Sequence, residues 1–327
     1  MSALLRIEDV SVHFPIRKGL LQRQVGAVRA VDSVTLELKK GEAFGLVGES
    51  GCGKTTLARA VLRLVDPTSG SIWFDGTNIS GLTPKGLAPF RKRIAAIFQD
   101  PFSSLNPRQK SGHIIAEVLQ VHNYDGDIKE RVAELLSICG LAPRFADLYP
   151  HEMSGGQRQR VGIARALALD PELIVCDEAV SALDVSIQAQ IINLLEELRV
   201  KFGLTYLFIG HDLSVVRHLC DRIAVMYLGR IMETGTAEEL FDNPKHPYTK
   251  ALIDAVPAPN FDNEDAPQAE ALKGEIPSPL APPSGCVFHT RCPIAFDRCS
   301  KVVPDITRLG KTHAAACFAL SNSEAPS

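Results

Sequence analysis

The chain has 327 residues, a formal net charge of −3, 45% hydrophobic residues and 22% charged residues. These values allow a large buried core, and they predict one large α/β domain with a small appendage or two modest domains. The slightly acidic balance does not favour general attraction to nucleic acid. No apolar run approaches the ~18 residues of a membrane helix, and the first residues lack the pattern of a secretory signal. We therefore expect a cytosolic chain, in which clustered cysteines indicate metal binding, chemistry or coincidence.

The first predicted elements are strands. Alternating apolar and polar residues in "LRIEDVSVHF" and "AVDSVTLEL" predict two strands within residues 1–38, joined by a basic loop over residues 15–26. "AFGLV" is typical of a short buried strand, and "KTTLARAVLRL" of a helix. Helical periodicity then runs from residue 111 to 140, where Gly140 is a plausible stop.

Strands and helices alternate in the next part of the chain. We predict a helix over residues 157–169, a strand at "ELIVC", a helix at "SIQAQIINLLEELRVKFG" and a strand at "LTYLFIG". Strands that are apolar throughout and alternate with helices favour a parallel sheet covered on both faces. Residues 256–284 are rich in proline and acid and are expected to form a linker, followed by a cysteine-bearing module over 285–327.

The segment "GLVGESGCGKTT" has the spacing of a phosphate-binding loop. Its glycines let successive N–H groups face phosphate oxygens, and the following helix points its positive end at the same place. Lys54 would reach the β- and γ-phosphates, and the Thr55 hydroxyl could ligate Mg²⁺. The predicted ATP-binding residues of the loop are Gly48, Glu49, Ser50, Gly51, Cys52, Gly53, Lys54, Thr55 and Thr56. We interpret Cys52 as a small residue and not as a reactive thiol.

Two further motifs carry polar groups to element ends. "LIVCDE" delivers Asp177 at the end of an apolar strand, where it suits a Mg²⁺ contact, and Glu178 could accept a proton from an attacking water. Alone, such a pair is more often a solvated strand end. "MSGGQRQR" opens a helix with Ser154, Gly155, Gly156 and Gln157, a second anion-receptive helix end. Two such ends suggest two chains that face each other, each lending this end to the other's nucleotide.

These motifs together resemble the ATP-binding-cassette ATPases over residues 4 to 255. The resemblance implies a nucleotide-binding domain over 1–255 with a parallel sheet core, an antiparallel β subdomain and a helical signature subdomain. It identifies Gln99 with the Q-loop glutamine, Ser154–Gln157 with the signature (after Met153, where leucine is commoner), Asp184 with the D-loop and His211 with the switch histidine. Phe14 is the candidate for adenine stacking, with a core residue of the strand as the alternative. Without the family, His211 would be interpreted as a strand-end histidine.

The family resemblance also implies roles at the nucleotide. Mg²⁺ would be held by Thr55 and Gln99 and approached by Asp177, while Glu178 polarises water. His211 would contact the γ-phosphate and the D-loop of the second subunit. The segment from Gln99 to Arg108 would touch a membrane subunit.

The resemblance narrows in the C-terminal part. "HPYTKALIDAVP" and "KGEIPSPLAPPSGCVFHTRCP" look like the ATPase subunits of dipeptide and oligopeptide importers, whose close relatives also serve nickel. This implies a peripheral subunit on the cytoplasmic face of the inner (cell) membrane, bound beneath two permease subunits. A second, often distinct ATPase subunit and an external solute-binding protein would complete the system. The alternatives are a soluble ATPase of the superfamily and a regulatory metal-sensing module.

Half of the eight cysteines gather near the end of the chain, as Cys286, Cys292, Cys299 and Cys317. Their uneven gaps of five, six and seventeen residues are wider than the pairs usual in zinc ribbons. Iron–sulfur clusters accept such spacings, and related importer ATPases carry a [4Fe–4S] cluster at matching cysteines, so we favour that cluster. The alternatives are Zn²⁺, with His289 and His313 as further ligands, and bare thiols without a metal. Cys139, Cys176 and Cys220 are expected in the core.

Overall fold

The computed structural model describes residues 3–19, 23–98, 104–181, 183–255 and 274–320. The contacts between residues divide the chain into two compact units. The first unit consists mainly of Phe74–Gly210, with Leu38–Ala43 and the chain's first residues. The second unit consists of Arg6–Glu37, Phe44–Trp73 and His211–Ser327.

The first unit contains three parallel strands in the order β6-β7-β8. They are β6 (Ile94–Ile97), β7 (Leu173–Asp177) and β8 (Thr205–Ile209), with Ile94 opposite Leu173 and Leu173 opposite Thr205. Every residue of β8 and the first four of β7 are buried. Because side chains on both faces of such strands are covered, the apolar run "ELIVC" forms a central strand rather than an alternating one.

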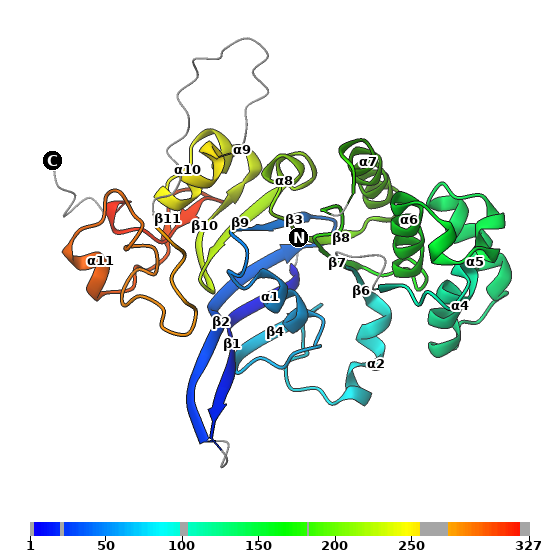
Figure 1. Ribbon diagram of the computed structural model, residues 1–327, viewed down its shortest axis with the longest axis horizontal. Coiled ribbons are helices and arrows are strands. Elements are labelled where there is room, and N and C mark those ends of the chain that lie inside the picture. The colour runs from blue at the N-terminus through cyan, green and yellow to red at the C-terminus, as the bar shows by residue number, and fades with distance from the viewer. Residues whose placement is uncertain (1–2, 20–22, 99–103, 182, 256–273, 321–327) are drawn as a thin grey trace, which may run out of the picture. The chain divides into compact units, whose positions relative to one another are not determined.

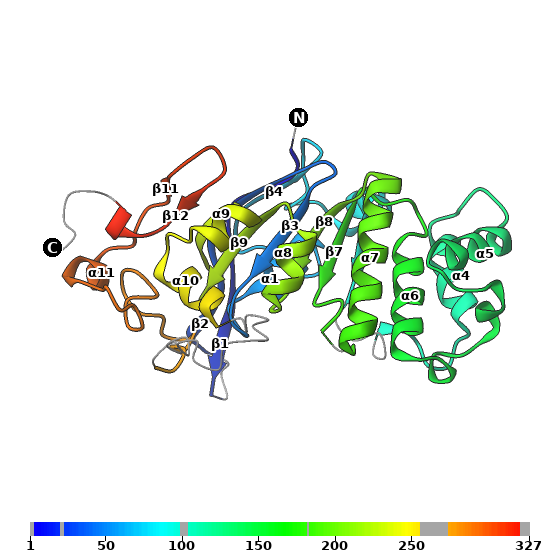
Figure 2. The same cartoon turned by 90° about the horizontal axis from the view of Figure 1, so that it is seen from above.

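Helices form most of the first unit. They are α2 (Pro84–Arg93), α4 (Ser111–Val121), α5 (Ile128–Ile138), α6 (Gly155–Ala166) and α7 (Val185–Phe202), with short 3-10 turns at Pro143–Asp147 and Pro150–Glu152 and the short strand β5 (Thr77–Asn78). α6 and α7 lie side by side (Figures 1 and 2). Asp127 caps α5 by accepting hydrogen bonds from the N–H groups of Lys129 and Glu130, and Gly140 follows that helix with a φ of 72°.

The second unit carries a mixed sheet in the order β3-β9-β10-β12-β11. β3 (Ala43–Val47) is parallel to β9 (Arg222–Tyr227), and β9 is antiparallel to β10 (Arg230–Thr236). The two-residue strand β12 (Ala314–Ala315) adds to the free edge of β10, with Glu233 opposite Ala315, and β11 (Thr307–Arg308) adds to β12. The C-terminal residues therefore extend the sheet that also contains β3.

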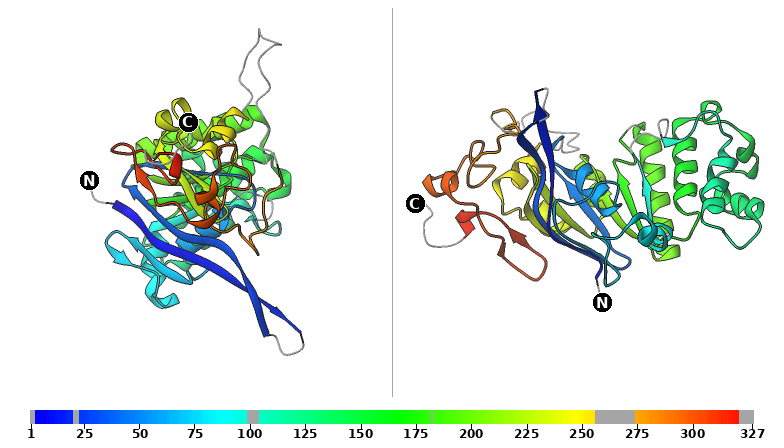
Figure 3. Two further views of the ribbon diagram at one scale, coloured as in Figure 1. Left: turned by 90° about the vertical axis from the view of Figure 1, so that its left-hand side faces the viewer. Right: turned by 90° about the horizontal axis from the view of Figure 1, so that it is seen from below.

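The second unit also contains two long strands, β1 (Ala3–Lys18) and β2 (Arg23–Lys39), which lie side by side with β4 (Ser69–Phe74) next to β1 (Figure 3). Its helices are α1 (Lys54–Val61), α8 (Leu213–Leu219), α9 (Ala237–Asp242), α10 (Pro247–Asp254) and α11 (Asp297–Lys301), with a 3-10 turn at Phe318–Leu320. In the part of the chain that the structure describes, no helix is long and apolar enough to cross a membrane.

The structure confirms the predicted buried strands and the helices of residues 111–140, and it corrects several boundaries. The expected loop over 15–26 is wrong in extent, because β1 continues to Lys18 and β2 begins at Arg23. The helix "KTTLARAVLRL" ends at Val61, since Arg63 adopts a left-handed φ of 53°. The helix expected over 157–169 spans Gly155–Ala166. The strand pattern predicted a parallel sheet core; in the second unit β3 and β9 are parallel, whereas β10, β12 and β11 add to them in antiparallel pairs.

Candidate functional site

The predicted phosphate loop lies between β3 and α1. Gly48 and Gly53 adopt φ values of 150° and 111°, which side-chain-bearing residues rarely adopt. A Cβ atom at Gly48 would lie 2.1 Å from the carbonyl oxygen of Met226 in β9, and one at Gly53 would lie 2.0 Å from that of Ala30 in β2. Both glycines are thus required by conformation and by space, and the loop packs tightly on two strands.

Lys54 begins α1 and turns its charge into this loop. Its Nζ donates to the carbonyl oxygens of Gly48 at 2.7 Å and Glu49 at 3.0 Å, and the residue is only 5% exposed. The ammonium group is therefore fixed inside the curled loop, where a phosphate chain would need a positive charge. Burial raises the pKa of the neighbouring Cys52 thiol, which agrees with the interpretation of Cys52 as a small packing residue.

An open depression of about 470 Å³ adjoins the loop. Gly48 and His211 both line it, together with the start and N-cap of α8 and two residues of the segment 252–255. Asp212 caps α8 by accepting hydrogen bonds from the N–H groups of Ser214 at 2.9 Å and Val215 at 3.3 Å. The structure thus brings His211 and the loop to one cavity, while the catalytic role of His211 stays a prediction.

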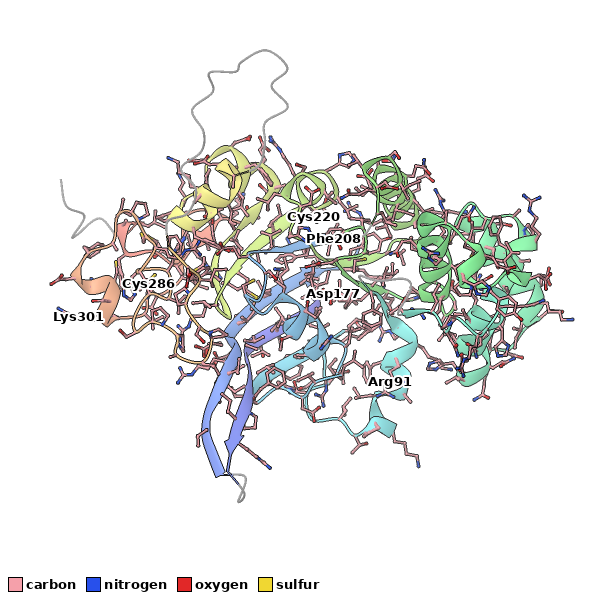
Figure 4. The ribbon with its side chains drawn as sticks, viewed as in Figure 1. Arg91, Asp177, Phe208, Cys220, Cys286 and Lys301 are labelled. Atoms are coloured by element: carbon pink, nitrogen blue, oxygen red, sulfur yellow. The ribbon has the colours of Figure 1, made fainter. Side chains whose placement is uncertain are left out.

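In the first unit, the acidic pair follows β7. Asp177 is the last residue of the strand and is partly exposed (Figure 4). Glu178 has a left-handed φ of 50°, held by the hydrogen bond from its N–H to the carbonyl of Ile209 at 2.9 Å and by Ser181, whose N–H and hydroxyl donate to the Glu178 carbonyl. Strained backbone of this kind costs on the order of 1–3 kcal/mol and clusters at functional sites. It agrees with the catalytic role predicted for Glu178 without testing it.

The signature residues form the N-terminus of α6. Ser154 caps the helix by accepting a hydrogen bond from the Gln157 N–H, and the Gln157 side chain accepts one from the Ser154 N–H at 2.9 Å. A Cβ atom at Gly156 would lie 2.6 Å from Cγ2 of Ile187 in α7, so this glycine allows the two helices to approach closely. Asp184 is the N-cap residue of α7 and is exposed.

Two further residues, Gln99 and Phe14, were predicted to contact the nucleotide. Gln99 lies outside the residues that the structure describes. Phe14 lies in β1 and is 41% exposed, so the alternative that it belongs to the core is wrong. Its role in adenine stacking stays a prediction.

The structure gathers the four C-terminal cysteines around one small cavity. Cys286, Cys292, Cys299 and Cys317 all line it, and so does His289. His313 does not line it, because its Nε2 lies 2.7 Å from the buried carboxylate of Glu233. Among the described residues, no group of three or more His, Cys, Asp or Glu side chains could hold a metal ion as placed. Figure 4 labels Cys286 and, on α11, Lys301.

Burial and the main chain act in opposite directions on the thiols of this cavity, and burial has the larger effect. Burial raises the pKa of Cys286, of Cys317 and of Cys292, which reaches about 11. Backbone hydrogen bonds from Phe288, Ile294 and Ala319, each two residues after a cysteine, lower these pKa values in opposition to the burial. Cys139, Cys176 and Cys220 are at most 5% exposed, which confirms them as core residues.

Sequence reasoning missed a link between the C-terminal segment and the phosphate loop. Arg291 donates two hydrogen bonds to the Glu49 carboxylate, at 2.7 and 3.1 Å. The Tyr248 hydroxyl in α10 accepts a hydrogen bond from the Glu49 N–H at 2.9 Å. Tyr248 and Arg291 are 199 and 242 positions from Glu49 in the sequence. No local pattern could have predicted the pairs, although the segment "HPYTKAL", which contains Tyr248, was singled out by its resemblance to the importer ATPases.

Comparisons with known proteins identify relatives along the whole chain. The family model described as ABC transporter matches residues 31–181, and that of the oligopeptide/dipeptide transporter C-terminal region matches residues 232–299. The oligopeptide transport ATP-binding protein AppF of Bacillus subtilis is 55% identical over 97% of this chain and 98% of its own length. OppF of Salmonella typhimurium, another oligopeptide transport ATP-binding protein, is 50% identical over 96% of both chains.

Solved structures give the same fold. The dimeric structure of the ATP-binding cassette MJ0796 in a post-hydrolysis state, bound to ADP and Pi, has a TM-score of 0.64 and 28% identity. The match covers 71% of this chain and 98% of that one. The expected ATP-binding-cassette fold is thereby confirmed for most of the chain.

Proposed function

The chain belongs to the ABC transporter family, and on that premise we propose that it is the ATP-hydrolysing subunit that powers oligopeptide import across a membrane. The observation that carries the proposal is the 55% identity to an oligopeptide transport ATP-binding protein over 97% of this chain, joined to a formed phosphate loop with Lys54 inside it. The alternatives of nickel transport and of a soluble superfamily ATPase are less well supported, because the family model of the oligopeptide transporters covers residues 232–299.

The phosphate loop binds the triphosphate of ATP in this proposal. The left-handed glycines Gly48 and Gly53 curl the loop so that its main-chain N–H groups would face the phosphates, and the N-terminus of α1 adds its partial positive charge. Lys54 turns from the loop carbonyls to the β- and γ-phosphates when they arrive. The Thr55 hydroxyl, Gln99 and Asp177 would hold Mg²⁺, which neutralises the charge that develops on the phosphates.

Hydrolysis needs a base and a group that orients the γ-phosphate. Glu178 accepts the proton of the attacking water in this proposal, and the left-handed backbone at this residue agrees with a functional position. His211, which lines the depression beside Gly48, contacts the γ-phosphate. Such hydrolysis depends mainly on positioning and on charge stabilisation.

A second ATPase subunit, the same chain or a related one, completes each site. The signature residues of α6 would face the nucleotide of the partner subunit, with Asp184 between the two sites. The dimeric form of the related cassette bound to ADP and Pi supports this arrangement. Two permease subunits and an external solute-binding protein would complete the importer, with this chain on the cytoplasmic face of the membrane.

The four C-terminal cysteines are proposed to bind a [4Fe–4S] cluster. They supply four thiolates around one cavity, and backbone N–H groups hydrogen bond to three of the sulfurs. A cluster carries its own irons and sulfides, so its four thiolates need not meet at a single atom as those of Zn²⁺ do. A bound cluster would cross-link the loop between Cys286 and Cys292 with Cys299 and Cys317.

The proposed function is tested by reconstituting this chain with its permease subunits in liposomes. ATP hydrolysis that rises when the binding protein delivers an oligopeptide, together with peptide uptake, would support it. Hydrolysis that proceeds without membrane subunits and ignores peptide would favour a soluble ATPase. Glu178→Gln is the matched inactive control, because it removes the base and keeps the size of the side chain.

A further inference from the structure

The loop between Cys286 and Cys292 touches the phosphate loop through a nearly buried ion pair. The Arg291 side chain is 5% exposed, and that of Glu49 is 22% exposed. Both terminal nitrogens of Arg291 donate to the two oxygens of the Glu49 carboxylate. The hydrogen bonds to Glu49 raise the pKa of Arg291 above its ordinary value, so the guanidinium remains charged.

The ion pair is held in place from both sides. Arg291 lies over the ring of Tyr227, with its Cζ atom 5.8 Å from the ring centre, and Phe288 packs edge-on against the same ring at 5.3 Å. Tyr248 contacts both aromatic rings, at 4.7 Å from Tyr227 and 5.2 Å from Phe288. Its hydroxyl accepts the hydrogen bond from the Glu49 N–H. An aromatic cluster thus fixes the geometry of the pair.

The charge of Glu49 makes this contact chemically important. Glu49 lies in the loop whose task is to bind a highly negative phosphate chain, and its carbonyl oxygen already holds Lys54. An unpaired carboxylate there would repel the phosphates, since charges in a partly desolvated site interact more strongly than in water. Arg291 cancels that charge, because its guanidinium pairs with both oxygens of the carboxylate.

We propose that Arg291 is a positioning residue for nucleotide binding: it neutralises the Glu49 carboxylate within the phosphate loop, so that the cysteine-bearing segment sets the affinity of the chain for ATP. This inference rests on the proposed ATP site at residues 48–56. Arg291 does not itself touch the nucleotide in this account. Arg291 acts through Glu49. The coupling is reciprocal: if the Arg291–Glu49 pair favours ATP binding, bound ATP favours the pair to the same extent.

A double-mutant cycle of Glu49 and Arg291 in the whole chain tests the proposal, with ATP affinity measured by titration of a fluorescent ATP analogue. Arg291→Gln should weaken binding about tenfold, which corresponds to roughly 1.4 kcal/mol. The double variant Glu49→Gln/Arg291→Gln should recover most of that loss, because both charges are then absent. Lys301→Gln is the control and should bind as the unchanged chain does, since Lys301 is 70% exposed and pairs only across 3.7 Å with Asp297.

Three outcomes would overturn the proposal. An unchanged ATP affinity in Arg291→Gln would show that Arg291 and the ATP site are not coupled. A double variant that binds ATP as weakly as Arg291→Gln would show that the loss comes from packing and not from the charge of Glu49. If Arg291→Gln does not fold, Glu49→Gln alone supplies the test: it should tighten binding several-fold, because it removes a negative charge from the loop, and weaker binding would refute the proposal. Lys54→Ala separates the two claims, since normal ATP binding in that variant would refute the proposed ATP site itself.

Discussion

Replacement of Glu233 by glutamine should strongly destabilise the attachment of the C-terminal segment. Glu233 lies in β10, and its side chain is fully buried. Its carboxylate accepts three hydrogen bonds: from the N–H of Lys245 at 2.7 Å, from the N–H of His246 at 2.8 Å and from His313 Nε2 at 2.7 Å. His313 precedes β12, so this carboxylate joins the last part of the chain to the sheet.

The size of the effect follows from those three contacts. Glutamine keeps one acceptor oxygen, which can serve Lys245 and His313, but its amide nitrogen would then face the His246 N–H. A buried N–H left without an acceptor costs about 1–3 kcal/mol, and the remaining two hydrogen bonds lose the strength that a charged acceptor gives. We therefore expect Glu233→Gln to lower the free energy of unfolding by about 2–4 kcal/mol.

Urea unfolding followed by circular dichroism would measure this difference, and limited proteolysis would show whether the segment after residue 284 becomes more accessible. Glu197→Gln is the matched control, because Glu197 is exposed on α7 and its replacement should change the free energy of unfolding by less than about 0.5 kcal/mol. A loss below about 1 kcal/mol in Glu233→Gln would refute the reasoning, since it would mean that the three donors find other acceptors at little cost.

Four further predictions concern the site and the C-terminal segment. Glu178→Gln should retain ATP and trap a closed dimer of ATPase subunits in gel filtration, and hydrolysis near the unchanged rate would exclude Glu178 as the base. Lys54→Ala should abolish measurable ATP binding and transport while the circular dichroism spectrum is preserved; an unaltered affinity would contradict the role of its charge. Protein purified without oxygen should be brown and contain about four irons per chain, and Cys292→Ser should lose both; stoichiometric zinc, or four titratable thiols without metal, would contradict the cluster. Burial lowers the pKa of His246 to about 4. The unfolded chain therefore binds a proton at this histidine at a higher pH than the folded chain does, and stability falls as the pH drops from about 6.5 towards 4. Between pH 7 and pH 5 the free energy of unfolding should decrease by about 2 kcal/mol more in the unchanged protein than in His246→Asn, and an equal pH dependence in both proteins would contradict this assignment.

The local features of this protein could be predicted from its amino-acid sequence. Gly48, Gly53 and Lys54 could be assigned because a phosphate loop is a short continuous motif, whose conformation follows from the freedom of glycine. β3, β7 and β8 could be predicted as buried strands, because a run of apolar residues between turns indicates coverage on both faces. The glycines of α6 and the stop at Gly140 followed from the same local rules.

The contacts between distant parts of the chain became visible only in the folded protein. It placed four cysteines around one cavity, added β12 to the edge of β10 and paired Arg291 with Glu49 across 242 positions. It also assigned His313 to Glu233 and not to the cysteines. These choices have no local signature, because they depend on which buried charge finds a partner once the chain has folded, and an arginine alone does not indicate which of many carboxylates it will meet.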